Sequence, residues 1–332
     1  MTRPDNIRHQ IELSIVIPGY NEAEIIGSNL RAVHEVASRL GVRFEILFVN
    51  DGSLDNTAEK VQALAGEISA LRLISYPQNR GRGHALRQGF HAARGDYILT
   101  IESDMNYGDK VIPDLYHAIY NSGNDVVVAS PYMEGGKNRN VPLKRILLSK
   151  WGNKVLSASL GGLVHTVSGM TRIYSRACIQ SLPLNSSDKE IHLEILSKAV
   201  ALGYKISEIP ATLAWPERKF QKTGQRKPSF NARKYILSHL AFTLFERPIL
   251  LFGVLGLGSF LSGILLGFYI IYLRFTGGLN PNRPLMTLVV LMVLGGIILV
   301  SFGLLGMQIN DLRKEIYRLQ GRDKTEDMHE GN

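Results

Sequence analysis

The chain has 332 residues, of which 45% are hydrophobic, with one cysteine and a formal net charge of +9. The single cysteine, Cys178, excludes an intramolecular disulfide and a cysteine-rich metal site, which fits a reducing compartment. The length allows one α/β core and a membrane segment, and the charge is compatible with nucleic acid, an anionic membrane or an anionic substrate as partner.

A polar tail, residues 1–12, precedes short β-branched runs that alternate with helix-length segments as far as Ser130. The runs are LSIVIP, FEILFVN, LRLISY, DYILTIES and DVVVAS. This rhythm is typical of a mostly parallel, Rossmann-like α/β sheet. Ligands of such sheets bind beyond the carboxyl ends of the strands, so the segments that follow the runs form the candidate site.

Three of these segments carry polar and acidic residues, and they are residues 19–22, 51–53 and 102–106. One acidic loop alone is more often a turn or a helix cap, whereas three at successive strand ends favour a shared site. Glu102, Asp104 and Asn106 alternate at a strand end, which predicts that their oxygens project to one side. We expect them to bind Mg²⁺ or Mn²⁺, which would neutralise a diphosphate.

The run NRGRGHALRQGF, residues 79–90, places glycines together with Arg82 and Arg87 at a loop-to-helix junction. Backbone N–H groups at the start of the helix and these two cations are expected to meet a phosphate of the donor. The run is not G-x-G-x-x-G and follows the third strand, and the chain has no G-x-x-x-x-G-K-[ST] motif. Dinucleotide-binding and P-loop folds are therefore not expected.

Two uncharged runs, residues 249–273 and 285–309, are each long enough to cross a hydrocarbon core of about 30 Å. A short turn joins them, which predicts a transmembrane hairpin. Lys and Arg are frequent before the first run and after the second but scarce in the turn, so both termini and the soluble domain are expected in the cytosol. Ser259, Gly263 and Gly267 recur every four residues and favour close helix packing, within the hairpin or in a homo-oligomer.

The segments that flank the hairpin are expected to lie near the membrane surface. Residues 231–248 combine basic and apolar side chains and predict an amphipathic interfacial helix, with a helix packed on the soluble domain as the alternative. Residues 310–332 are expected to form a cytosolic tail that is disordered beyond Arg322.

The segments IPGYNE, VNDGSLDNT, NRGRGHALRQG, ESDMN and SGMTRIYSR, in this order and followed by a hairpin, resemble family 2 glycosyltransferases with a GT-A fold. The likeness extends to the polyprenyl-phosphate glycosyltransferases, including dolichol-phosphate mannose synthases, and covers about residues 13–230 as the catalytic domain. It implies donor contacts from the residues on the P-x-Y-N-E and D-D-G-S segments, which are Pro18, Tyr20, Glu22, Asn50 and Asp51. It also implies that Glu102, Asp104 and Asn106 form the metal and diphosphate segment.

The resemblance further implies an acceptor site. Arg145 and Ser149 match a pair, four residues apart, that engages the acceptor phosphate, and Arg172 matches a further arginine of the site. Arg218 and Lys227 lie in a basic segment that resembles the mobile acceptor loop of the family, although attraction to anionic lipid explains them nearly as well. The expected catalytic residues are Asp104, Arg145 and Arg172.

Three residues depart from the pattern of the family. Asn50 replaces the first aspartate of D-D-G-S, which leaves the donor base open, and Glu102 replaces the first aspartate of the metal segment. Pro131 stands where G-S-R-Y-x-x-G-G has an arginine, so one contact to the acceptor phosphate is missing. The basic residues that could substitute for it are Lys137, Arg139 and Lys144.

These patterns predict an inverting transfer of one sugar from a GDP- or UDP-linked donor to a dolichyl or undecaprenyl phosphate at the cytosolic membrane face. A phosphate monoester is already anionic at pH 7, so it needs no catalytic base, and the processive Q-x-x-R-W motif is absent. Two alternatives stay open: transfer to a lipid or glycan hydroxyl with Glu190 or Glu194 as base, and a non-catalytic nucleotide-binding scaffold. Nucleic acid is not an expected partner, because the basic residues gather near phosphate loops and the membrane.

Overall fold

The computed structural model describes residues 11–215, 249–277 and 284–330, and the chain divides into two units. The first unit comprises Met1–Arg226 with Gln320–Asn332, and the second Lys227–Leu319. Arg218, Lys227, the predicted interfacial helix 231–248 and most of the 1–12 tail lie outside the described residues.

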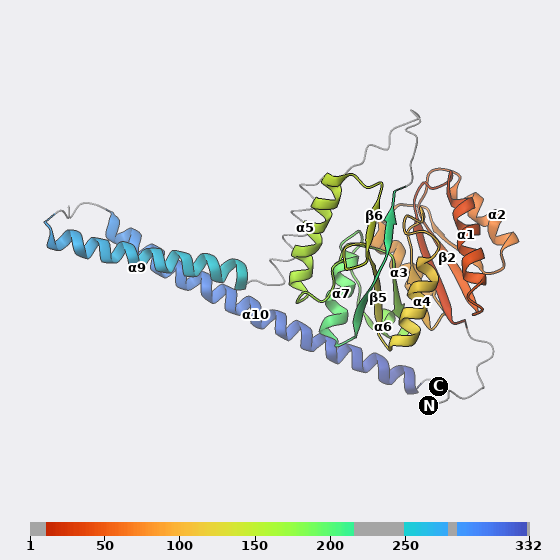
Figure 1. Ribbon diagram of the computed structural model, residues 1–332. Helices are drawn as coiled ribbons and strands as arrows, with labels where there is room; N and C mark the ends of the chain where they lie inside the picture. The colour runs from red at the N-terminus through yellow and green to blue at the C-terminus, as the bar shows by residue number, and fades with distance from the viewer. Residues whose placement is uncertain (1–10, 216–248, 278–283, 331–332) are drawn as a thin grey trace. The chain divides into compact units, whose positions relative to one another are not determined.

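The first unit is built on a seven-stranded sheet (Figure 1). Its strands are β1 Leu13–Gly19, β2 Phe44–Asp51, β3 Leu71–Tyr76, β4 Tyr97–Thr100, β5 Val126–Ser130, β7 Arg172–Ser175 and β8 Ile206–Pro210. Their order is β3-β2-β1-β4-β7-β5-β8, and β7 alone of these strands runs antiparallel to its neighbours. The expected mostly parallel sheet is therefore confirmed, and all five predicted strands are present.

Helices cover both faces of this sheet. They are α1 Ile26–Ser38, α2 Thr57–Glu67, α3 Arg82–Ala92, α4 Val111–Ser122, α5 Leu143–Ser159, α6 Arg176–Ser181 and α7 Ile191–Ala201. The contacts of α1 with α2 and α4 place these three on one face, and α3 packs with α6 on β1, β2 and β4 from the other. Strands β6 Lys137–Arg139 and β9 Thr212–Ala214 pair separately as a short parallel ribbon.

The apolar core lies between the sheet and α1, α2 and α4. Leu13, Ile15 and Ile17 of β1 are at most 2% exposed and belong to this cluster; each such side chain contributes about 1.5–3 kcal/mol on full burial. On the opposite face α3 approaches β1 so closely that a Cβ at Gly89 would lie 2.3 Å from the Val16 side chain. Only glycine allows this contact without displacing the helix.

The second unit contains a short π-helix, Ile249–Gly253, which leads into α9 Val254–Phe275, and the apolar first half of α10 Leu285–Glu330. Two segments, Leu251–Phe275 and Leu285–Ile309, are long and apolar enough to cross a membrane, and only 17% and 11% of their most apolar windows are buried. These segments match the two predicted spans.

Small residues bring α9 and α10 together. A Cβ at Gly256 would lie 2.7 Å from the Gly296 carbonyl oxygen, and the converse distance is also 2.7 Å. Ser259 Oγ donates to the Met292 carbonyl at 2.9 Å, and Gly263 faces Val293. The expected small-residue packing is thus found within the hairpin. α10 continues past the second predicted span to Glu330, and the disorder expected beyond Arg322 stays a prediction.

Candidate active site

The candidate site begins where β2, β1 and β4 end side by side, since parallel neighbours bring their following loops to one edge. Asn21, in the left-handed region at φ 55°, donates its N–H to Ser53 Oγ at 2.9 Å and accepts from Leu54 N at 2.8 Å through Oδ1. Asn29 of α1 donates to the Ser103 carbonyl at 2.7 Å. These contacts join the three predicted loops, as the strand pattern implied.

The side chains of Asn50 and Asp51 form hydrogen bonds that connect the loops after β2 and β3. Asn50 donates to Ser75 Oγ at 2.9 Å and accepts from Ser53 N at 3.2 Å. The Asp51 carboxylate accepts from Tyr76 Oη at 2.8 Å, from Arg80 N at 2.9 Å and from Gly81 N at 3.0 Å. Both residues are at most 5% exposed, so they shape the loops, and their contact with a donor remains a prediction.

The metal segment forms a turn. β4 ends at Thr100, and Met105, at φ 49°, donates its N–H to the Glu102 carbonyl at 3.1 Å. The strand-like alternation that we expected for residues 102–106 is therefore wrong. The turn still gathers the side chains, because Asn106 Nδ2 donates to Asp104 Oδ2 at 2.6 Å.

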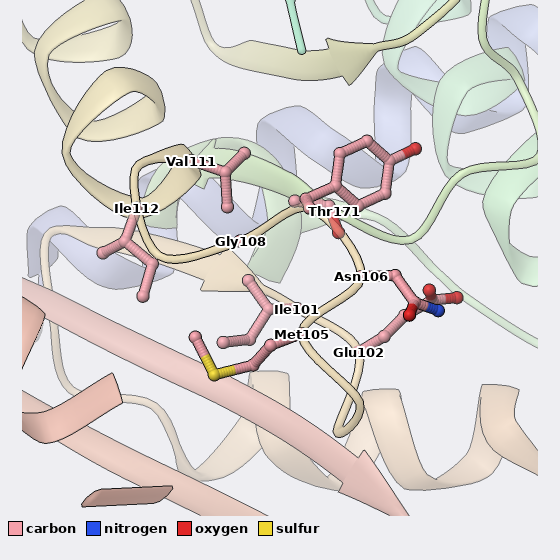
Figure 2. A pocket seen from close by; sticks show the side chains of 9 residues that line it. Ile101, Glu102, Met105, Asn106, Gly108, Val111, Ile112 and Thr171 are labelled. Carbon is pink, nitrogen blue, oxygen red and sulfur yellow. The ribbon is translucent and has the colours of Figure 1, made fainter. Parts of the chain in front are cut away.

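The oxygens of this turn suit a hard cation. Asp104 Oδ1 and Asn106 Oδ1 are buried and have no hydrogen-bond partner within the described residues, and buried polar atoms are rarely left so. Figure 2 shows the ends of Glu102 and Asn106 close together, away from Val111 and Ile112. Two carboxylates and an amide form a donor set that fits Mg²⁺ or Mn²⁺. Beside it lies a small, mainly apolar pocket lined by Ile101, Met105, Tyr107, Gly108, Val111, Ile112 and Thr171.

The charges of three cationic side chains act on the carboxylate of Glu102. Burial raises the pKa of Glu102, Asp104 raises it further, and Arg82, Lys189 and Arg145 oppose the rise. Arg82 Nη1 lies 3.6 Å from Glu102 Oε1. This edge therefore concentrates positive charge around an oxygen-donor turn, which suits a diphosphate with its metal.

Backbone amides of residues 79–90 form hydrogen bonds with another loop of the protein. The N–H groups of Gly83 and His84 donate to the Ser187 carbonyl, at 2.9 and 3.2 Å, and a Cβ at Gly83 would lie 2.5 Å from the Ser186 carbonyl oxygen. Arg87 donates to the carbonyls of Leu184 and Asn185. These two amides and Arg87 hold residues 184–188 and are engaged within the protein. The contact of this loop, and of Arg82, with a phosphate stays a prediction.

The same loop explains Glu194, whose role the sequence left open. The Glu194 carboxylate accepts from Asn185 N at 2.9 Å, from Ser186 N at 2.8 Å and from Lys198 Nζ at 2.6 Å. Burial opposes ionisation, but these hydrogen bonds prevail and lower the pKa of Glu194. Glu194 thus anchors the loop that carries Lys189, a cation near Glu102 that no motif of the sequence pointed to.

The predicted acceptor residues fall into two groups. Arg145 and Ser149 lie on α5, where the Arg145 guanidinium carbon is 4.4 Å from the centre of the Trp215 ring and Asn153 Nδ2 donates to the Ser149 carbonyl at 2.9 Å. Arg172 is fully buried and donates to the carbonyls of His192, at 2.9 Å, and Val167. Burial lowers the pKa of Arg172. The charge of Arg145 thus acts on Glu102, whereas the buried Arg172 holds two backbone carbonyls.

Pro131 is buried directly after β5, at the carboxyl edge. Asn138 Nδ2 donates to its carbonyl at 3.3 Å. The candidate substitutes Lys137, Arg139 and Lys144 are all exposed.

Two known proteins are similar to this chain in sequence over most of its length. An undecaprenyl-phosphate 4-deoxy-4-formamido-L-arabinose transferase of Klebsiella pneumoniae subsp. pneumoniae is 29% identical over 308 residues, which cover 92% of this chain and 90% of the relative. A dolichol-phosphate mannosyltransferase of Pyrococcus furiosus is 29% identical over 258 residues, 77% of this chain and 70% of the relative.

Solved structures agree in fold. A glucosyl-3-phosphoglycerate synthase from Mycobacterium tuberculosis in complex with uridine-diphosphate aligns with a TM-score of 0.50 and 21% identity, over 70% of this chain and 80% of that one. This likeness, together with the strand order, confirms the mostly parallel GT-A type of sheet. The model of "Glycosyl transferase family 2" matches residues 14–182, slightly more than half of the sequence, and the chain therefore belongs to glycosyl transferase family 2.

Proposed function

We propose that this chain transfers one sugar, with inversion, from a GDP- or UDP-linked donor to the phosphate of a polyprenyl phosphate. The observation that carries the proposal is an oxygen-donor turn with Arg82 Nη1 3.6 Å from Glu102 Oε1, on which the charges of Lys189 and Arg145 also act. Arg145 lies on α5, a helix with exposed apolar side chains. The names of the relatives, an undecaprenyl-phosphate transferase and a dolichol-phosphate mannosyltransferase, support this acceptor class.

On the donor side, Glu102, Asp104 and Asn106 would hold Mg²⁺ or Mn²⁺, which would supply Lewis-acid stabilisation of the leaving diphosphate. Arg82 and Lys189 add positive charge where negative charge develops. The nucleoside is expected to contact the residues of the first two loops, which are Pro18, Tyr20, Glu22, Asn50 and Asp51.

On the acceptor side, Arg145 and Ser149 bind the phosphate and orient one oxygen toward the anomeric carbon. That oxygen forms the new C–O bond while the bond from the anomeric carbon to the diphosphate oxygen breaks, and the nucleoside diphosphate leaves with the electron pair. No proton has to be removed, because the phosphate is already ionised at pH 7. The engagement of Glu194 with Lys198 and the loop amides is consistent with a mechanism that uses no side-chain base.

A lipid acceptor also explains why α5 exposes apolar side chains and lysines. Leu143, Leu147 and Trp151 recur at four-residue spacing and are 71%, 60% and 56% exposed, and the exposed lysines among them are Lys144, Lys150 and Lys154. Apolar side chains flanked by lysine suit an interfacial position on an anionic bilayer. In this proposal α5 lies on the membrane and α9 and α10 cross it, with both termini and the catalytic domain in the cytosol.

Transfer by the purified full chain in nanodiscs tests this function. With UDP- and GDP-sugars, Mn²⁺ and undecaprenyl or dolichyl phosphate, we expect a glycolipid that mild acid hydrolyses and that does not form in the presence of EDTA. An acid-stable product would instead indicate a hydroxyl acceptor, and donor binding without any product would favour a scaffold.

A further inference from the structure

Trp215 lies directly after β9 and its ring faces α5. The backbone N–H of Trp215 donates to the Arg139 carbonyl of β6 at 3.0 Å, which continues the ladder between β9 and β6. The guanidinium carbon of Arg145 is 4.4 Å from the centre of the indole ring, within the distance of a cation–π contact. The backbone of Trp215 is therefore fixed, and its ring contacts an exposed arginine of α5.

The residue before Trp215 holds the metal segment. Ala214 N donates to the Asn106 carbonyl at 2.8 Å. Two consecutive residues therefore contact the metal turn on one side and the predicted acceptor arginine on the other. Ala214 fixes the backbone of a metal-binding residue, and Trp215 contacts Arg145, whose charge acts on Glu102. The end of β9 therefore links Arg145 to the metal turn and constrains the distance between them.

We propose that Trp215 is a positioning residue that orients the Arg145 guanidinium toward the acceptor phosphate, in fixed register with the metal turn. This inference rests on the proposed function, in which Arg145 binds that phosphate. Stacking on a ring restricts the rotamers of an exposed arginine, and the planar guanidinium suits this contact better than a lysine ammonium does. The role is local to the acceptor side, since the ring contact involves Arg145.

A double-mutant cycle tests the inference in the full chain. We expect Trp215→Leu to raise the KM for polyprenyl phosphate about three- to fivefold, the factor that an exposed cation–π contact supplies, with little change in the donor KM. Trp215→Phe keeps a ring and should retain most of the affinity. In an Arg145→Ala background, Trp215→Leu should have no further effect, because it acts through that arginine. Equal effects in both backgrounds would overturn the proposal.

Tryptophan fluorescence provides a measurement that needs no turnover. The chain has two tryptophans, so Trp151→Phe leaves Trp215 as the only one. In that background Arg145→Ala should shift the emission of Trp215 and increase its quenching by acrylamide. The control Arg39→Ala, which removes an exposed arginine directly after α1, should do neither.

The two measurements separate two kinds of failure. If the wild type transfers no sugar to a lipid phosphate, the proposed function is wrong even when the emission responds to Arg145→Ala. If the wild type is active but the emission does not respond, the positioning role of Trp215 is wrong.

Discussion

Asp104 is the residue with the sharpest expected effect. Its Oδ1 is buried without a partner among the described residues, and Asp104→Asn keeps the shape but removes the negative charge that binds a dication. We expect at least about a 100-fold fall in kcat and weaker Mn²⁺ binding in a titration. Asp109→Asn, at a neighbouring exposed position, should change neither by more than about twofold. Full activity of Asp104→Asn would contradict the metal assignment.

The lowered pKa of Glu194 predicts how the stability of the protein depends on pH. Its hydrogen bonds lower its pKa from the ordinary 4.5, so its contribution to stability is present above about pH 4.5 and disappears as the pH falls through the lowered value. Glu194→Gln leaves Lys198 without a carboxylate, and we expect a loss of about 2 kcal/mol at pH 7, roughly 4–8 °C in Tm.

The difference in Tm between the wild type and Glu194→Gln should shrink toward pH 3.5 in thermal melts. A difference that does not vary with pH would indicate that packing, and not the charge of Glu194, holds the loop.

At the scale of elements, α5 is predicted to contact the bilayer. Leu147→Asp places a charge in the middle of the exposed apolar row, so we expect about tenfold slower transfer to polyprenyl phosphate in nanodiscs, with an unchanged donor KM. Tyr120→Ser, at an exposed position on α4, serves as control. A short-chain acceptor phosphate in solution should be used equally well by both variants, and a defect of Leu147→Asp there would argue against membrane contact.

Two adjacent glycines of the hairpin, Gly295 and Gly296, are expected to respond differently to substitution by leucine. A Cβ at Gly296 would meet the Gly256 carbonyl oxygen at 2.7 Å, whereas one at Gly295 would meet nothing within 4 Å. Gly296→Leu should separate α9 from α10 and lower the Tm in detergent by several degrees, since overpacking costs about 1–3 kcal/mol. Gly295→Leu should leave it unchanged, and equal effects of the two changes would contradict the close contact.

The elements differ in how far the sequence predicts them. The five strands were predictable because each is a β-branched run followed by a helix-length segment. β7 was missed as a strand because RIYS has only two apolar residues between polar ones, and β8 was missed because ISEIP lacks an apolar run. The hydrogen bonds that hold the site were beyond prediction, since they join distant residues, as Arg87 and Leu184 do across 97 positions.

At the scale of the whole molecule, the proposed orientation predicts which parts of the chain face the cytosol. Cys178, the one native cysteine, is fully buried, so it should react slowly with an impermeant maleimide. Thr276→Cys, between the two spans, should be labelled from outside intact cells, and Glu330→Cys only after permeabilisation. Labelling of Glu330→Cys in intact cells would reverse the orientation.

The reversed direction of β7 has a consequence for how this enzyme can diversify. β5 ends at the carboxyl edge, and β7 begins at that same edge, because Arg172 pairs with Thr100 of β4 and Val128 of β5. Residues 131–171, which include α5, therefore leave and re-enter the sheet on one side without a crossover. Such an excursion can be lengthened, shortened or exchanged while every strand of the seven-stranded sheet keeps its register. A graft of this segment from a relative should exchange acceptor preference and leave donor preference unchanged.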